Sequence, residues 1–136
     1  MQNSRPAPLA GLRVIESSLL GPAAITTHLA DLGAEVIKVE SPAGDYVREM
    51  TWPIINGVSL LHMHVNRGKK SVVLDLKVQE GAGLYRGLVR GADVVVEAVG
   101  SVETLNQAIG MTRRSGHVAV FGMPPTTARV PFDWDT

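Results

Sequence analysis

Short apolar runs alternate with amphipathic stretches along most of the chain. Five runs are rich in Val, Ile and Leu and are bounded by Gly, Pro or Ser, which is typical of buried β-strands. The stretches between them carry helix signals, such as Pro22 in a first turn and Gly33 after a last turn. The predicted strands cover residues 12–17, 35–40, 71–76, 93–99 and 117–122.

Three of the intervening stretches predict helices, over residues 21–34, 77–91 and 101–114. In the first helix, helical spacing predicts one buried face that is formed by Ile25, His28, Leu29 and Leu32. The second contains Gly81, Gly83 and Gly87, each of which costs about 1 kcal/mol relative to alanine inside a helix. Residues 41–59 are expected to be a long polar connection, and residues 123–136 a proline-rich tail.

Strands that are separated by helices of this length pair in parallel through right-handed crossovers. Nearly continuous apolar strands indicate a sheet that is covered on both faces. The pattern therefore predicts a single three-layer, Rossmann-like α/β domain over residues 1–136, with a five-stranded parallel sheet in the order 3-2-1-4-5. In such a sheet a ligand binds beyond the carboxyl ends of the first and fourth strands, here at the sequences IESSLLGP and EAVGSVE.

Composition narrows the classes of partner. The chain has 136 residues, 45% hydrophobic and 19% charged, as in an ordinary globular domain. Lys plus Arg and Asp plus Glu both number 13, so bulk charge favours neither nucleic acid nor an anionic membrane. The chain lacks cysteine, which excludes disulfides and thiolate zinc sites. With no apolar run of membrane-spanning length and a polar start, MQNSRPAP, we expect a soluble, cytoplasmic protein.

The strongest polar motif is the sequence NRGKKS, residues 66–71. Its three cations, Arg67, Lys69 and Lys70, surround a glycine before the third strand, an arrangement that suits a phosphate group. A solvated run of charge is the alternative explanation. The start of the first helix, at Gly21 and Pro22, is a weaker candidate for binding an anion.

Other polar residues give no catalytic arrangement. His62 and His64 are predicted on one side of an extended segment, as a pair of metal ligands requires, but no third ligand is evident and packing is favoured over metal binding. His28 is expected to be a core or interface residue. Glu16 and Glu97 end neighbouring strands and could form a carboxylate pair, although capping of nearby helix starts is favoured. Ser17 and Ser18 have no partners for nucleophilic catalysis.

Residues 8–96 resemble the class III acyl-CoA transferases, the formyl-CoA and carnitine-CoA transferase family. The resemblance rests on the sequences PLAGLRVIE, GPAAITTHLADLGAEVIKVESPAGD, NRGKKSVVLDLKVQEG and LVRGADVVVE. It implies interlocked dimers, so we expect a homodimer, and it implies that the basic loop and the end of the first strand hold the nucleotide part of coenzyme A. The residues nominated by position are Ser18, Leu19, Leu20, Asn66, Arg67, Lys69 and Lys70.

The resemblance changes after the fourth strand. Where that family has an asparagine and then an arginine-proline-glycine turn, this chain has Ala98, Val99 and Gly100, and no residue corresponds to the family's catalytic aspartate. Residues 91–136 are instead similar to the second half of the nicotinamide-binding domain of medium-chain alcohol dehydrogenases. The chain lacks the Gly-x-Gly-x-x-Gly half of that domain, so NAD(P) is a weaker candidate than coenzyme A.

The two resemblances meet in the sequence GADVVVEAV, which both families place in a strand. The sequence therefore predicts a chimera that changes family at about residue 96, or else a natural truncated gene. Three functions follow as alternatives: a domain that binds coenzyme A without catalytic turnover, an NAD(P)-binding fragment, or a recombined or designed scaffold without a ligand. The first is favoured because of the basic loop. No metal is expected.

Overall fold

The computed structural model describes residues 6–18, 20–97 and 102–120. Five parallel strands form the main sheet in the order β5-β2-β1-β6-β7, which confirms the predicted order 3-2-1-4-5. The strands are β1 (Arg13–Glu16), β2 (Glu35–Glu40), β5 (Lys70–Val73), β6 (Val94–Glu97) and β7 (His117–Val120).

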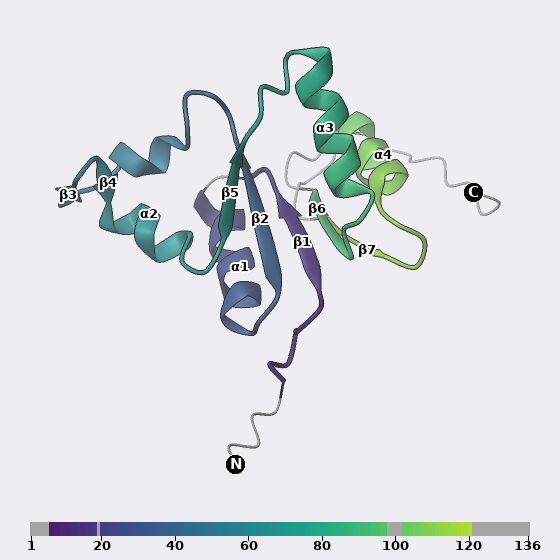
Figure 1. Ribbon diagram of the computed structural model, residues 1–136, viewed down its shortest axis with the longest axis horizontal. Helices are drawn as coiled ribbons and strands as arrows, with labels where there is room; N and C mark the ends of the chain where they lie inside the picture. Colours follow the sequence, from purple (N-terminus) through teal and green to yellow (C-terminus); the bar gives the residue numbers. More distant parts are fainter. Residues whose placement is uncertain (1–5, 19, 98–101, 121–136) are drawn as a thin grey trace.

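Helices cover both faces of this sheet and make three layers (Figure 1). Because side chains alternate along a strand, Val14 faces one layer while its neighbour Ile15 faces the other. Val14 packs with Val36 near Leu29 of the first helix, and Ile15 belongs to the larger core under the other two. The three helices are α1 (Leu20–Asp31), α3 (Gln79–Val89) and α4 (Val102–Met111).

The first helix buries a different face from the predicted one. Its buried residues are Ala23, Thr26 and Thr27, whereas Ile25, His28 and Leu32 are exposed. Both threonine hydroxyls donate to the carbonyl oxygen of Ala23 at 2.9 Å, so they enter the interior already hydrogen-bonded. The prediction was wrong at these positions because it ranked residues by apolarity and gave no weight to polar groups that find partners inside the fold.

The connection between β2 and β5 also has more structure than predicted. It contains the short helix η1 (Tyr46–Glu49), the hairpin of β3 (Ile54–Ile55) and β4 (Val58–Ser59), and the helix α2 (Leu60–Val65). This segment lies beside the β5 edge of the sheet (Figure 1). Asn56 and Gly57 form the hairpin turn with positive φ angles of 52° and 75°, which is the residue pair that such turns prefer.

The main sheet is paired much less extensively between β1 and β6 than between β6 and β7. Strand β6 is an inner strand, as predicted, with β1 on one side and β7 on the other. It shares four register pairs with β7 but only one, Val14 with Val94, with β1. The junction is extended at the amino end of β6, where Asp93 N donates to Arg13 O at 3.0 Å and Arg13 N donates to Asp93 Oδ2 at 2.8 Å.

Candidate functional site

A groove of about 470 Å³ opens beyond the carboxyl ends of β2 and β5. Its walls come from residues 41–45, which follow β2, and residues 74–77, which follow β5, with Ser17 contributed by the end of β1. Parallel α/β sheets bind ligands beyond the carboxyl ends of their strands. The volume lies within the range of small-molecule sites, and the groove is therefore the candidate binding site.

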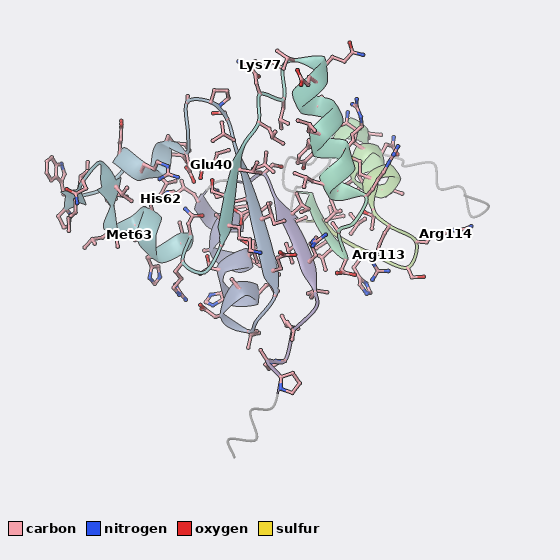
Figure 2. All side chains as sticks on the ribbon, in the orientation of Figure 1. Glu40, His62, Met63, Lys77, Arg113 and Arg114 are labelled. Atoms are coloured by element: carbon pink, nitrogen blue, oxygen red, sulfur yellow. The ribbon has the colours of Figure 1, made fainter. Side chains whose placement is uncertain are left out.

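The groove combines apolar walls with one exposed lysine at its rim, and its lining also includes Glu40, Asp45 and Asp75. Pro42, Leu74 and Leu76 supply apolar surface, and the exposed Lys77 stands near the start of α3 (Figure 2). Among the ion pairs of the described residues, Lys77 takes part in none. The Lys77 backbone N–H donates to Asp75 Oδ1 at 3.0 Å, which fixes the turn that carries it. This arrangement suits a ligand with a flat apolar part and an anionic part.

The loop after β2 is anchored to Glu40, whose carboxylate is buried under it. Arg48 Nη2 donates to Glu40 Oε1 at 2.8 Å, Ser71 Oγ donates to the same oxygen at 2.7 Å, and Asp45 N donates to Oε2 at 3.0 Å. Burial by itself raises the pKa of Glu40, but the hydrogen bonds from Arg48 and Ser71 outweigh it and lower the pKa. The groove wall therefore rests on an ionised carboxylate.

Two buried lysines form ion pairs with carboxylates at or after the ends of neighbouring strands, beneath the groove. Lys38 Nζ lies 3.0 Å from Glu16 Oε1 and 3.1 Å from Asp45 Oδ2, and it donates to Ser18 O at 2.8 Å. Lys69 Nζ lies 2.7 Å from Glu16 Oε2. The side chains of all four ionisable residues are at most 2% exposed. Two ammonium groups thus balance two carboxylates, which is the condition under which buried charge is tolerated.

The predicted phosphate loop is largely engaged within the protein. Lys69 also donates to Ala23 O at 2.6 Å, and burial lowers its pKa although Glu16 opposes this. Arg67 Nε donates to Asp31 Oδ1 at 3.1 Å, and Lys70 Nζ donates to Glu35 Oε1 at 2.7 Å. The loop precedes β5, whereas the groove follows it. The role of these cations in binding stays a prediction.

None of the nominated residues that the structure describes lines the groove. Ser18 accepts from Lys38 through its carbonyl group, Leu20 starts α1 with a φ of 50°, and Asn66 ends α2 as its C-terminal cap. Leu19 lies outside the described residues. A signal for Lys77 was present in the sequence: the strand-end rule applies equally to the second and third predicted strands, and Lys77 directly follows the third.

Two predictions about ionisable groups need correction. Among the residues that the structure describes, Glu16 accepts from Lys38, Lys69 and the Thr26 hydroxyl, none of which is a backbone group at a helix start, and the side chain of Glu97 lies outside the described residues. His62 and His64 lie on helix α2 and not on an extended segment. Two residues apart on a helix, they point in different directions, so His62 is buried and His64 exposed. No cluster that could hold a metal ion occurs among residues 6–18, 20–97 and 102–120.

The family model for CoA-transferase family III matches residues 9–115, well over half of the chain. The chain belongs to CoA-transferase family III. The match runs through the predicted crossover at residue 96 and includes α3, β6 and α4. The alcohol dehydrogenase resemblance and the chimeric origin stay predictions. Within the part of the chain that the structure describes, no helix has both the length and the apolar content needed to cross a membrane.

Curated proteins that are similar to this chain are named as CoA transferases. Succinate–glutarate CoA-transferase of Agrobacterium fabrum is 49% identical over 106 residues, which are 71% of this chain and 26% of the relative. A probable fatty acyl-CoA transferase of Mycobacterium tuberculosis is 42% identical over 113 residues, 77% of this chain and 28% of the relative. This chain thus spans about a quarter of the length of these relatives.

Solved structures share the fold. A CAIB/BAIF family protein from Brucella suis superposes with a TM-score of 0.65 at 38% identity, over 82% of this chain and 30% of that one. A hypothetical protein from Mycobacterium tuberculosis gives a TM-score of 0.69 at 32% identity, over 96% of this chain and 39% of that one. The three-layer fold is therefore that of CoA-transferase family III.

Proposed function

We propose that this CoA-transferase family III chain binds the nucleotide part of coenzyme A or of a CoA thioester in the groove beyond β2 and β5. The observation that carries the proposal is the pairing of apolar walls with the exposed ammonium of Lys77 at one rim. We place the adenine ring against the apolar side chains of Pro42 and Leu74, which both line the groove, because burial of its faces there is favourable. A phosphate group would then lie within reach of Lys77.

The names of the relatives support this ligand class. Succinate, glutarate and fatty acyl groups differ in size and charge, but each name contains CoA as the shared carrier. A site common to these proteins would therefore recognise the carrier and not the acyl group. We assign no acyl group to this chain.

We further propose that the chain does not transfer acyl groups by itself. Covalent transfer of an acyl group to a carboxylate of the protein requires that this carboxylate be accessible as a nucleophile. Glu16 is only 3% exposed, and its carboxylate accepts from two lysines and a threonine. Glu40 is held in the same way by Arg48 and Ser71. Transfer of acetyl from acetyl-CoA to succinate by the purified chain would contradict this proposal.

Calorimetric titration with CoA tests the binding site, and two exposed lysines give matched variants. If the groove binds CoA, Lys77→Ala weakens binding by about 10- to 100-fold, because a hydrogen bond to a charged group contributes about 1.5–3 kcal/mol. Lys70→Ala then leaves the affinity unchanged. The opposite pattern would move the site to the basic loop. Lys69 is unsuitable for this test because its buried ammonium also supports the fold.

The titration also separates the alternative ligands. NAD and NADP serve as nucleotides with adenine but without the pantetheine arm, and dephospho-CoA lacks the 3′-phosphate. Binding of CoA in preference to NAD supports the proposal, and weaker binding of dephospho-CoA would place the 3′-phosphate near Lys77. If none of these nucleotides binds, the remaining explanation is a scaffold without a ligand.

A further inference from the structure

Asn66 joins a histidine to a lysine at the end of α2. Its side-chain nitrogen lies 3.1 Å from His62 Nδ1, and its side-chain oxygen lies 3.4 Å from Lys69 Nζ. An ammonium group can only donate, so Lys69 takes the amide oxygen and leaves the amide NH₂ facing the imidazole. His62 Nδ1 must then accept a hydrogen bond, which requires a neutral ring with its proton on Nε2.

A second partner for the same ring nitrogen lies close by. Asp45 Oδ2 is 3.9 Å from His62 Nδ1, and its side chain is fully buried. Lys38 Nζ lies 3.1 Å from Asp45 Oδ2 as an ion pair, but among the described residues no group makes a hydrogen bond to that oxygen. A proton on Nδ1 would therefore remove the hydrogen bond that Nδ1 accepts from the Asn66 amide, and the new N–H would find an acceptor in Asp45 Oδ2.

Charged groups of both signs face His62. Arg48 of η1 and Lys38 of β2 disfavour its protonation, whereas Asp45 and Glu40 favour it. Burial of the ring has the largest effect, and the pKa of His62 is lowered from its ordinary value. The other titratable groups on α2 and on the helices packed against it, all exposed, are His28, Asp31, Tyr46, Glu49 and His64.

We propose that His62 is a proton-controlled latch between α2 and the charge network beneath the groove. In the neutral state its Nδ1 accepts from Asn66, and Asn66 holds Lys69. On protonation Nδ1–H donates to Asp45, the Asn66 amide is displaced from the ring, and its contact with Lys69 is lost. Few atoms move, because His62 Nδ1 has a hydrogen-bond partner in both states. That partner is the Asn66 amide when the ring is neutral and Asp45 Oδ2 when the ring is protonated.

The latch acts on the wall of the groove. Asp45 is the last residue of the loop that lines the groove after β2, and its backbone N–H and Oδ1 bind Glu40 and Val47 N. Figure 2 labels His62 and Glu40; His62 belongs to α2, and Glu40 ends β2, from which this loop leads to η1. Drawing Oδ2 toward α2 would shift the loop. Ligand affinity in the groove then depends on the protonation of His62, a consequence that rests on the proposed function.

Nitrogen-15 NMR of the imidazole rings in the complete chain tests the latch directly. The wild-type protein is expected to show His62 as the Nε2–H tautomer and to titrate it below the ordinary pKa of histidine. Asn66→Asp presents a carboxylate to the ring and is expected to raise the pKa of His62 by about one unit or more. His62→Gln and His64→Gln assign the signals. An Nδ1–H tautomer in the wild type would overturn the proposal without any variant having to fold.

A second measurement tests the effect on the groove. CoA affinity is compared at about pH 7.5 and at a pH below the midpoint of the His62 titration that the NMR experiment gives, because the pKa of His62 is lowered from its ordinary value. Because a phosphate of CoA titrates in the same range, the informative quantity is the difference in pH dependence between wild type and His62→Gln. We expect about a fivefold difference, the lower end of typical coupling between linked sites. Equal pH dependence would exclude an effect of the latch on the groove, whereas absence of CoA binding at both pH values would instead refute the proposed function.

Discussion

Two glycines of α3 are expected to respond in opposite ways to the same substitution. A Cβ atom built on Gly81 would lie 2.1 Å from the carbonyl oxygen of Asp75, whereas one on Gly83 would meet nothing within 4 Å. Real Cβ atoms do not approach backbone oxygens so closely, so Gly81→Ala must push the Asp75 turn away from the helix. Gly83→Ala only removes conformational freedom from the unfolded chain.

The magnitudes follow from these contacts. Gly83→Ala is expected to stabilise the protein by about 1 kcal/mol, the difference in helix propensity between the two residues. Gly81→Ala has the same gain in propensity, but overpacking costs about 1–3 kcal/mol, and here the displaced atom is backbone. We therefore expect Gly81→Ala to destabilise the protein by up to about 2 kcal/mol, so that the two variants differ by about 1–3 kcal/mol.

Urea unfolding followed by circular dichroism measures the difference, with the slope of the transition confirming that both variants unfold alike. In a thermal scan, 1 kcal/mol corresponds to roughly 4 °C for a domain of this size. Asp75 belongs to the groove wall, so Gly81→Ala should also weaken CoA binding while Gly83→Ala leaves it unchanged. Equal stabilisation by both substitutions would refute the close approach of α3 to the Asp75 turn.

Other variants test the charge network, the histidines and the exposed apolar surface. Lys38→Met leaves two buried carboxylates without one of their cations and is expected to cost about 3–5 kcal/mol, whereas Lys70→Met breaks an exposed pair and should cost under about 1 kcal/mol in urea unfolding. Because the pKa of His62 is lowered in the folded state, its contribution to stability is present above the unfolded pKa of about 6.5 and is lost as pH falls. Between pH 7 and pH 5, the stability of His62→Gln should therefore fall less than that of wild type or of His64→Gln. Trp52, 85% exposed on the hairpin segment, is expected to take part in self-association, so Trp52→Ser should shift a homodimer toward monomer in light scattering; a wild-type monomer at high concentration would contradict this expectation.

The sequence was sufficient for the order of the sheet but not for the burial of its helices. Strand order follows from the alternation of strands and helices and from the handedness of crossovers, which are local and general. The buried face of α1 depends on Thr26 and Thr27, whose hydroxyls have one acceptor in their own helix, Ala23 O, and a second that the fold brings from elsewhere, on Glu16 for Thr26 and on Val65 for Thr27. Periodicity of apolar residues cannot anticipate such partners.

The same distinction applies to the candidate site. Arg67, Lys69 and Lys70 are close in sequence and were predicted to act together, yet each meets a different carboxylate, on Asp31, Glu16 and Glu35. Neighbouring residues at the start of a strand point in different directions, and long-range partners decide what each one does. Gly81 and Gly83 show the same effect, since the two residues differ only in what the fold places beside them.

The single register pair between β1 and β6 also bears on how the molecule loosens. A β-sheet opens locally where the fewest hydrogen bonds must break, and here this is the junction between β1 and β6. It separates β5, β2 and β1 from β6 and β7. Amide protons of β6 and β7 should therefore exchange with deuterium together and sooner than those of β2, which has four pairs on each side. The groove is lined by residues at or after the ends of β1, β2 and β5, which form the slower-exchanging half. A ligand that is bound there therefore stays bound while the other half opens and closes again.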